Sequence, residues 1–482
     1  MTQRSGAGIV PEGACLSVRI LYLALLFQMA DLSNTDQYKV AISYRQILRM
    51  ALPISLAIFV PQINFITNNI FLGRLDETSE ALSTAGITGV YYLLFAALGM
   101  GLNSGLQALI ARRAGEGRIE EIGKLFSQGL WICLGLAFLG IGLTYFVAPS
   151  ILSYSLHSHA LLDQAMQFLR IRIWGLLFLY IYQMRNALLV GTNQSKYLVW
   201  GTLAETGVNV LLDYGLIYGH FGLPALGFNG AAIASVIAEA TGMLVVFLVI
   251  HRKGIGRQLQ LYRHIRFDSV NSRLILTQSS PLVFQYAISI LSWIFFYILI
   301  EHHGRQALAI SSTMRNIFGL FGVFIWAFAS TTNAMVSNVI GQGKPDRVFL
   351  LIGRIVKLSM GSALIIAVVL NVFPEIFLSI YGQGAGFSEA AIPIVRVVST
   401  ALIMMSFSTV WLNAVTGTGN TRITLAIEFI TIVFYCLYVY FILERWKLPI
   451  LYGWMSEWVY WTSMFSFSFW YMRSGKWKGK II

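Results

Sequence analysis

Long apolar segments, separated by short polar ones, follow one another along most of the chain. Each is about 20 residues or longer, the length that an α-helix needs to cross the hydrocarbon core of a bilayer. Charged residues are rare inside these segments and gather between them. The pattern predicts an all-α integral membrane protein with twelve membrane-spanning helices. We expect these helices at residues 46–72, 81–111, 122–147, 164–190, 197–219, 230–251, 274–301, 306–340, 350–373, 391–416, 421–443 and 451–472.

Composition and charge agree with a membrane location. Hydrophobic residues make up 57% of the chain and charged residues only 11%, whereas a soluble domain has about 25% charged residues. The net charge of +13 comes from Lys and Arg that gather in alternate loops, at 112–124, 252–273, 344–347 and 473–480. This is the positive-inside distribution, which predicts that both termini lie in the cytoplasm. The expected location is the inner (plasma) membrane of a bacterium. The basic excess therefore indicates topology, and we expect no nucleic-acid partner.

The chain contains two copies of one unit. Segments 115–118 and 341–344 share the pattern Gly-X-Gly-basic and lie 226 positions apart. The same separation relates Gly191 to Gly417 and Arg170 to Arg396. Because each copy has an even number of predicted spans, the two copies are parallel repeats, an arrangement typical of secondary transporters.

The repeats and the basic loops predict the domain organisation. Residues 1–28 are expected to be a disordered or mis-started extension, with Met29 as the true start. The predicted parts are a cytoplasmic N-terminal extension at 1–44, an N-terminal lobe at 45–251, a basic cytoplasmic linker at 252–272, a C-terminal lobe at 273–473 and a cytoplasmic tail at 474–482.

The fifth predicted span carries the main candidate site. Glu205, Asn209 and Asp213 are spaced by four residues, so they line one face of a helix over about 12 Å. A charged side chain at the bilayer centre costs about 2.5–3.5 kcal/mol, so this face must look into the bundle or into a wet cavity. Such carboxyl groups can bind a proton or a sodium ion in one state and release it in another. The alternative is a fixed hydrogen-bonded contact between helices. Of the three residues, Asp213 is the preferred candidate.

Other intramembrane residues are secondary candidates. Glu239 and Glu428 lie inside predicted spans, and interior aromatic residues such as Tyr92 and Trp326 offer faces that attract organic cations. The sequence contains no GxxxxGK[ST], HExxH or GxSxG motif and no Cys/His spacing typical of a metal site. We therefore predict no enzyme activity, no resident metal and no cofactor. The expected energy source is an ion gradient.

In order and spacing, several short segments resemble the multidrug and toxic compound extrusion (MATE) family, from about residue 48 to residue 470. They are Ala-Leu-Pro at 51–53, Phe-Leu-Gly-Arg at 71–74, Ile-Ala-Arg-Arg-Ala-Gly-Glu-Gly at 110–117, Asn-Val-Leu-Leu-Asp at 209–213, Ile-Gly-Gln-Gly at 340–343 and Gly-Thr-Gly-Asn at 417–420. The resemblance implies two six-helix lobes that form a V around a central cavity. It also implies an antiporter that exports small cationic or amphipathic compounds, including drugs and toxic metabolites, in exchange for protons or sodium ions.

The resemblance also suggests which residues couple ions to export. The Asn-X-X-X-Asp pair of the family matches Asn209 and Asp213, and a polar residue late in helix 4 corresponds to Asn186. One position departs from the family, because Asn68 stands where many members have an Asp, and Asn cannot titrate. We expect Glu205 to supply the missing carboxyl group. Proton and sodium coupling, and the identity of the exported compound, both stay open.

One alternative within the wider superfamily is a flippase for a lipid-linked saccharide precursor. Such a protein is expected to have a strongly cationic cavity, and Arg185 and Arg315 are few for that purpose. A receptor or an enzyme would need a sensor domain or a catalytic constellation, which the sequence lacks. A channel fits buried titratable groups in a duplicated bundle less well than alternating access does. A monomer surrounded by membrane lipid suffices for export, because the cleft lies within one chain.

Overall fold

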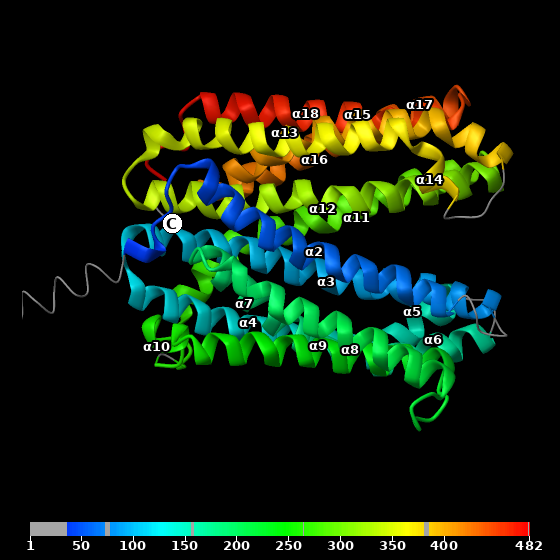
Figure 1. Cartoon of the computed structure of the whole chain (residues 1–482), viewed down its shortest axis with the longest axis horizontal. Coiled ribbons are helices and arrows are strands. Elements are labelled where there is room, and N and C mark those ends of the chain that lie inside the picture. The colour runs from blue at the N-terminus through cyan, green and yellow to red at the C-terminus, as the bar shows by residue number, and fades with distance from the viewer. Residues whose placement is uncertain (1–35, 73–77, 156–158, 264, 380–384, 481) are drawn as a thin grey trace, which may run out of the picture.

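The computed structural model describes residues 36–72, 78–155, 159–263, 265–379, 385–480 and 482, except for the side chains at 36, 63–70, 72, 78–83, 85, 155 and 385. Within these ranges every regular element is a helix, which confirms the predicted all-α fold. The helices run side by side along the long axis of the molecule, in two bundles (Figure 1).

The first bundle comes from the N-terminal half of the chain and the second from the C-terminal half (Figure 1). The first contains α2 (Tyr44–Leu72), α3 (Thr78–Glu116), α4 (Ile119–Phe146), α5 (Ala148–Ser155), α6 (His159–Arg172), α7 (Gly175–Gly191), α8 (Leu198–Tyr218) and α9 (Gly227–Arg252). The second contains α11 (Ser269–Glu301), α12 (Arg305–Gly341), α13 (Val348–Val372), α14 (Pro374–Ser379), α15 (Ala385–Gly417), α16 (Thr421–Val439), α17 (Ile450–Trp454) and α18 (Ser456–Arg473). Short turns of helix at Asp36–Tyr38, Ser195–Tyr197, α10 (Ile255–Gln258), Pro345–Arg347 and Tyr440–Arg445 complete the described chain.

Not every helix is long and apolar enough to identify it as a membrane span. In the described part of the chain eight helices meet this test, or nine if the bent pair α6 and α7 is one span. Helices α2, α8 and α18 lie at the other predicted spans, and α8 carries the polar stripe that lowers its hydropathy. The count of twelve membrane crossings stays a prediction.

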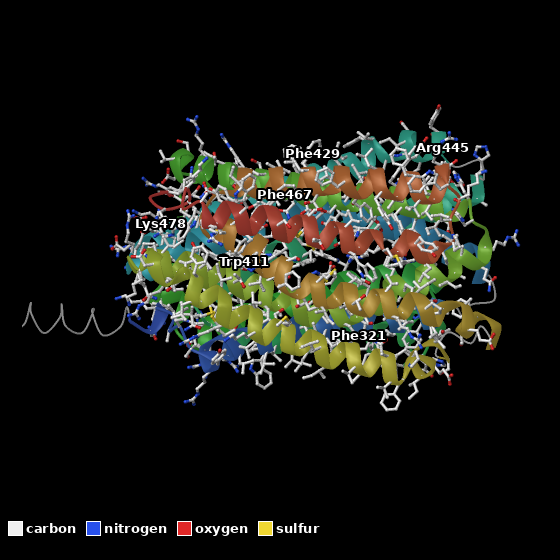
Figure 2. All side chains as sticks on the ribbon, turned by 90° about the horizontal axis from the view of Figure 1, so that it is seen from above. Phe321, Trp411, Phe429, Arg445, Phe467 and Lys478 are labelled. Atoms are coloured by element: carbon white, nitrogen blue, oxygen red, sulfur yellow. The ribbon has the colours of Figure 1, made fainter. Side chains whose placement is uncertain are left out.

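Apolar side chains cover the sides of the bundles, and many charged ones lie at the ends. Figure 2 shows Phe429 and Phe467 along the length of the molecule, with Lys478 and Arg445 toward opposite ends. Phe429 is 57% exposed, as expected for a side chain that contacts lipid in the membrane. We call the end that carries residues 112–118, 252–263, 341–347 and the described chain termini the basic end.

One predicted span is wrong in detail. We expected a continuous helix at 164–190, but α6 and α7 meet at an angle of 45° between Arg172 and Gly175. The physical reason is an ion pair at the bend, described below. The apolar segments on either side of the bend are together long enough to cross a membrane, so the sequence pattern does not reveal the break.

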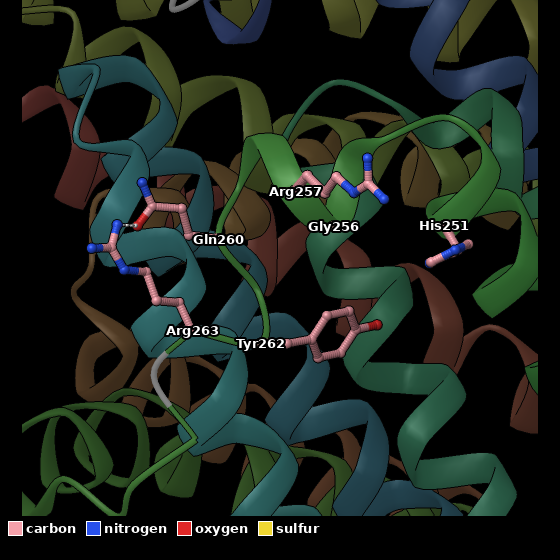
Figure 3. A pocket seen from close by; sticks show the side chains of 6 residues that line it. All are labelled: His251, Gly256, Arg257, Gln260, Tyr262 and Arg263. Carbon is pink, nitrogen blue, oxygen red and sulfur yellow. Dashed lines mark hydrogen bonds between the residues drawn. The ribbon is translucent and has the colours of Figure 1, made fainter.

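The linker between the lobes is folded against α4. Ser127 donates a hydrogen bond to the carbonyl of Leu261, and Gln128 donates to that of Arg266. Basic side chains of the linker stay outside, where Arg257 and Arg263, together with His251 of α9, line an open surface pocket (Figure 3). The linker is therefore a structured cover over one lobe, rather than only a polar connection.

The linker ends where Asp268 caps α11. Its carboxylate accepts hydrogen bonds from the backbone of Val270 and Asn271. The Asn271 side chain also donates to it and, together with these bonds, lowers the pKa of Asp268 below its usual range. The cap satisfies backbone donors that the first turn of the helix leaves free.

The two bundles meet where α3 packs against α11 and α12. The contact with α12 lies near the basic end. Gln107 donates a hydrogen bond of 2.8 Å to the carbonyl of Ser330, and Asn333 donates one of 3.0 Å to the carbonyl of Ser104. These two bonds are equivalents, because 104 and 330, and likewise 107 and 333, are separated by the repeat distance of 226. The interface thus follows the internal repeat, and each lobe contributes the same contact to the other.

Glycines allow the two helices to approach this closely. A Cβ atom on Gly115 would overlap the carbonyl oxygen of Asn338, and one on Gly341 would overlap that of Arg112. Gly115 and Gly341 are repeat equivalents, as are Arg112 and Asn338. The first glycine of each Gly-X-Gly-basic segment is therefore needed for helix contact. The second glycines, at 117 and 343, adopt φ of 75° and 71°, which ends the helix.

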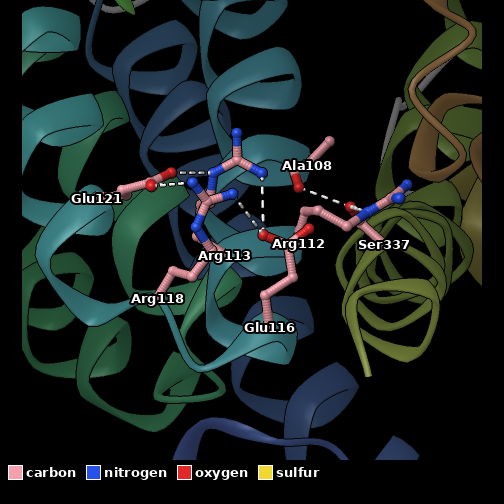
Figure 4. A network of polar contacts seen from close by, with 7 residues as sticks. All are labelled: Ala108, Arg112, Arg113, Glu116, Arg118, Glu121 and Ser337. Atoms are coloured by element: carbon pink, nitrogen blue, oxygen red, sulfur yellow. Dashed lines mark hydrogen bonds and ion pairs between the residues drawn. The ribbon is translucent and has the colours of Figure 1, made fainter. Parts of the chain in front are cut away.

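Arg112 extends this contact to a third helix. Its buried guanidinium donates to the carbonyl of Thr418, at the end of α15, at 3.2 Å. Next to it, Arg113 and Arg118 form ion pairs with Glu116 and Glu121 (Figure 4). The four charged side chains at the turn between α3 and α4 are therefore paired with one another. Arg112 instead reaches the other lobe.

The described part of the predicted N-terminal extension packs into the same interface. We call residues 36–43 the strap. Its backbone at Val40 donates to Asn338 Oδ1 at 3.1 Å, and Asn338 Nδ2 donates to the carbonyl of Tyr38 at 3.0 Å. Gln342 donates to the carbonyl of Val40, and the Tyr38 hydroxyl donates to Gln258 of the linker. The strap thus joins both lobes and the linker at the basic end.

We predict that Gly115→Ala destabilises the protein, because the new methyl group forces α3 and α12 apart. Overpacking of this kind costs about 1–3 kcal/mol. Gly135→Ala in α4 is the matched control, since its Cβ would meet no atom within 4 Å. That change is expected to be neutral, or stabilising by up to about 1 kcal/mol. Unfolding of the purified protein in detergent measures both, and equal behaviour of the two variants contradicts the predicted helix contact.

Candidate functional site

The stripe on α8 lies inside the N-terminal lobe, where α8 packs between α2 and α9. Asp213 is 0% exposed and Asn209 is 4% exposed. Among the described residues, neither carboxylate oxygen of Asp213 has a hydrogen-bond partner, and Asn209 Nδ2 has none either. Buried polar groups are almost always hydrogen-bonded, because leaving them bare is costly. The Asp213 carboxyl group is therefore suited to hold a proton or a bound cation.

Aromatic side chains lie around the end of α8 that is far from the basic end. The Tyr218 hydroxyl donates to the carbonyl of Phe71 on α2 at 2.7 Å. The Phe71 ring also contacts the rings of Tyr214 and Tyr218, with centroids 6.2 Å and 6.0 Å apart. These contacts hold α2 against α8 within about one turn of Asp213.

Glu205, one turn further along the stripe, faces α9. A Cβ atom on Gly242 of α9 would lie 2.8 Å from Glu205 Oε2, so glycine at this position makes room for the carboxyl group. Glu239, which is paired with Arg172, lies three residues before Gly242 on the same helix. The two acids of the stripe therefore differ in their neighbours. Asp213 has no hydrogen-bond partner among the described residues, whereas Glu205 lies near the helix segment that carries Glu239.

Glu239 has a basic partner that the sequence interpretation missed. Its carboxylate forms two parallel hydrogen bonds with Arg172, of 2.6 Å and 2.9 Å, and accepts a third from Tyr92 at 3.2 Å. The Arg172 guanidinium also lies over the Tyr92 ring, 3.7 Å from its centroid. A Cβ atom on Gly175 would overlap both charged groups. The bend between α6 and α7 thus accommodates a buried ion pair, and Glu239 is a neutralised group.

Glu428 lies in the other lobe, separate from the stripe. It is buried between α11, α16 and α18, where Ser289 donates to it at 2.6 Å and Gln285 at 3.4 Å. The Tyr460 hydroxyl is a third donor. The structure therefore does not bring Glu428 together with Asp213, and it gives Glu428 the hydrogen bonds that Asp213 lacks.

A family model called MatE matches the chain twice, over residues 53–215 and 281–441. The two matches together cover more than half of the 482 residues. This chain belongs to the MATE family. Each half of the MATE chain matches separately, in agreement with the repeat of 226 positions.

Curated relatives of this MATE chain carry the name "Probable multidrug resistance protein NorM". The one from Bradyrhizobium diazoefficiens is 25% identical over 417 residues, which are 84% of this chain and 87% of that protein. The one from Thermotoga maritima is 20% identical over 443 residues, 91% and 94% of the two chains. The match to the Synechocystis protein is 28% identical over 229 residues and spans 48% of that relative, about half its length.

Solved MATE structures share the fold. One, described as an outward-facing conformation of a multidrug resistance MATE family transporter, has a TM-score of 0.81 at 17% identity and covers 93% of this chain and 99% of its own. A MATE structure in complex with MaL6 has a TM-score of 0.83 at 16% identity, with the same coverage. The two-lobe arrangement of this MATE chain is thereby confirmed.

Two residues that the MATE resemblance suggested are not placed at the site. The side chain of Asn68 lies outside the described residues, although α2, which carries it, packs against α8. Asn186 lies on α7, whose main packing partners are α3, α4 and α9. One turn before Asn186, Tyr182 contacts Thr202, about three turns of α8 before Asp213, so the structure does not bring Asn186 to Asp213. In the described part of the chain, no three His, Cys, Asp or Glu side chains gather in a way that suits a metal ion.

We predict that Arg172→Met strongly destabilises this MATE protein. The variant leaves Glu239 buried without its partner, and breaking a buried ion pair in this way costs about 3–5 kcal/mol. Arg170→Met is the matched control, because Arg170 is exposed two residues away. The free energy of unfolding is measured in detergent. The double variant Arg172→Met/Glu239→Gln should recover much of the loss, and a double variant as unstable as the single one contradicts the pairing.

Proposed function

We propose that this MATE chain is an antiporter, driven by an ion gradient, that exports small organic cations, drugs or toxic metabolites. The observation that carries the proposal is the buried Asp213 carboxyl group, which has no hydrogen-bond partner among the described residues. A group in these surroundings exchanges a proton or sodium ion when its access to water changes, because its charged form needs a counter-charge or a solvent. Asn209 supplies an amide in the next turn.

Export by alternating access is supported by the way in which the lobes meet. Residues 105–115 of α3 are buried, whereas several residues of its first half, such as Val90 and Leu94, are more than 40% exposed. On α12 the residues near the basic end are likewise buried, and Arg315 is exposed. The lobes therefore close at the basic end and separate toward the other end. A second state with the opposite closure would let the same site face both sides of the membrane.

The assignment of sides follows from the basic residues. If the basic end faces the cytoplasm, as the positive-inside distribution predicts, the described conformation is open to the outside and both termini are cytoplasmic. We infer an inner-membrane location from the bacterial NorM relatives. A monomer is sufficient, since the two lobes of one chain surround the path.

The flippase alternative has no support in these contacts. Arg185 donates to the carbonyl of Met243 and lies over the Phe247 ring, 5.1 Å from its centroid. Arg172 is neutralised by Glu239. Arg172 and Arg185 are thus already engaged and do not form the cationic cavity that a pyrophosphate group requires.

We predict that Asp213→Asn lowers gradient-driven efflux of a fluorescent organic cation at least tenfold, because an amide cannot exchange a proton and binds sodium more weakly. The assay uses cells without their own pumps, with all variants at equal membrane abundance. Asp163→Asn is the control, since Asp163 is an exposed acid on α6. An uncoupler and sodium-free buffer, applied separately, identify the coupling ion. Full efflux by Asp213→Asn contradicts coupling at this residue.

The contribution of Glu205 is tested separately in the same assay. We expect Glu205→Gln to reduce efflux, because we assign to Glu205 the second carboxyl group that Asn68 cannot provide. Efflux at the wild-type rate would show that Asp213 acts without it. Gly242→Ala, which presses on the Glu205 carboxyl group from α9, should shift activity in the same direction as Glu205→Gln.

A further inference from the structure

A pocket on the flank of the C-terminal lobe, close to the basic end, contains two arginines. It has a volume of about 400 Å³ and lies between the end of the linker, the beginning of α11 and the first turn of α16. Thr421 donates a hydrogen bond of 3.4 Å to Gln278, which holds the start of α16 against α11. The lining of the pocket includes Phe267, Ser269, Arg273, Thr277, Ser280 and Arg422.

The two arginines lack a counter-charge. Among the described residues, neither Arg273 nor Arg422 forms an ion pair or a hydrogen bond. The acid nearest to Arg273 along the chain, Asp268, is already engaged, because its carboxylate caps α11. Two guanidinium groups that line one pocket without an acid raise its positive potential, so the pocket attracts an anion.

Hydroxyl groups of α11 accompany the arginines. Ser269, Thr277 and Ser280 are exposed, and their hydroxyls have no hydrogen-bond partner in the described part of the chain. Together with Arg273 they follow a spacing of four, four and three residues, which places all of them on one face of the helix. Hydroxyl and guanidinium groups donate hydrogen bonds, and phosphate oxygens accept several such bonds at once. This row of donors is therefore suited to a phosphate group.

Further along both helices the same outward faces become apolar. Phe284 of α11, about one turn after Ser280, is 62% exposed. Phe429 of α16, about two turns after Arg422, is also exposed and lies along the length of the molecule (Figure 2). Side chains exposed on the flank of a membrane bundle contact the hydrocarbon tails of lipids. The pocket thus lies where the outer surface changes from apolar to basic, which is the depth of the lipid phosphate groups.

The linker and the first turn of α11 add exposed apolar side chains next to the arginines. Ile265, Phe267 and Val270 are each more than half exposed. Trp131 of α4 donates a hydrogen bond of 2.8 Å to the carbonyl of Ile265, which fixes this segment in place. Large apolar side chains interspersed with arginines are typical of segments that lie in the membrane interface. The ligand that suits these surroundings has both a phosphate group and an apolar part.

We propose that this pocket binds the phosphate group of an anionic phospholipid from the leaflet that surrounds the basic end. Arg273 and Arg422 donate to the phosphate oxygens, and the hydroxyls of α11 bind the phosphate or the glycerol. The acyl chains lie along the apolar faces of α11 and α16. Basic pockets beside membrane helices are a known means of binding anionic lipid headgroups.

The charge of the pocket favours an anionic lipid over a zwitterionic one. A headgroup with an ammonium group brings a positive charge close to two unpaired guanidinium groups, whereas phosphatidylglycerol brings only hydroxyls. A free phosphate ion offers the same oxygens, but it makes no use of the exposed rings of Phe267 and Phe284. Lipid binding here does not depend on the export proposed above, because the pocket shares no residue with the stripe on α8.

The test counts the lipids bound to the purified full chain by native mass spectrometry during a titration with phosphatidylglycerol. Phosphatidylcholine with the same acyl chains shows how much of the binding depends on headgroup charge, and inorganic phosphate in large excess shows whether a phosphate group alone occupies the pocket. We expect Arg273→Gln/Arg422→Gln to weaken binding of the first phosphatidylglycerol at least tenfold and to leave phosphatidylcholine binding unchanged. Arg347→Gln/Arg473→Gln is the matched control, because both arginines are exposed near the basic end and lie outside the lining.

A second pair of variants changes the shape of the pocket without changing its charge. Ser280→Trp should also weaken phosphatidylglycerol binding, since the new ring fills the pocket, whereas Ser466→Trp on an exposed face of α18 should not. The proposal is overturned if the two lipids bind the wild type equally well, or if inorganic phosphate displaces the lipid. It is also overturned if Arg273→Gln/Arg422→Gln or Ser280→Trp binds phosphatidylglycerol like the wild type, or if the control variants lose as much affinity.

Discussion

The close approach of α3 and α12 is the constraint on which the rest of the structure depends. Two glycines at equivalent positions, Gly115 and Gly341, let each helix touch the backbone of the other. Without a hydrophobic force between helices in lipid, such contact and a few interhelical hydrogen bonds are what hold lobes together. The hydrogen bonds that Gln107 and Asn333 donate across this contact are equivalent under the internal repeat.

Three buried acids illustrate three solutions to the cost of charge in a membrane protein. Glu239 has a full counter-charge in Arg172, and Glu428 has several neutral donors. Asp213 has neither among the described residues. The first two arrangements stabilise one structure, because any movement would break their bonds. Of the three acids, only Asp213 has a carboxyl group whose protonation or cation binding depends on what the solvent supplies. A coupling site needs this property.

Local periodicity was sufficient for part of this result. The four-residue spacing of Glu205, Asn209 and Asp213 predicted a shared face, and α8 carries that face into the bundle. Contacts between distant segments were not accessible in this way. Arg172 meets Glu239 across 67 positions, and no feature of either segment indicates the other. The Gly-X-Gly-basic segments revealed the internal repeat in the sequence, while their role in helix contact required the partner helix.

The strap has a consequence for how the closed basic end behaves. It continues directly into α2 of one lobe, yet its backbone bonds to Asn338 and Gln342 of the other. It is in effect a ligand of the second lobe that is covalently attached to the first. A tethered ligand of this kind is present at a high effective concentration and is never diluted away. If the basic end opens, as the proposed alternating access requires, its closed arrangement can therefore form again by an intramolecular step, at a rate independent of how much protein the membrane contains.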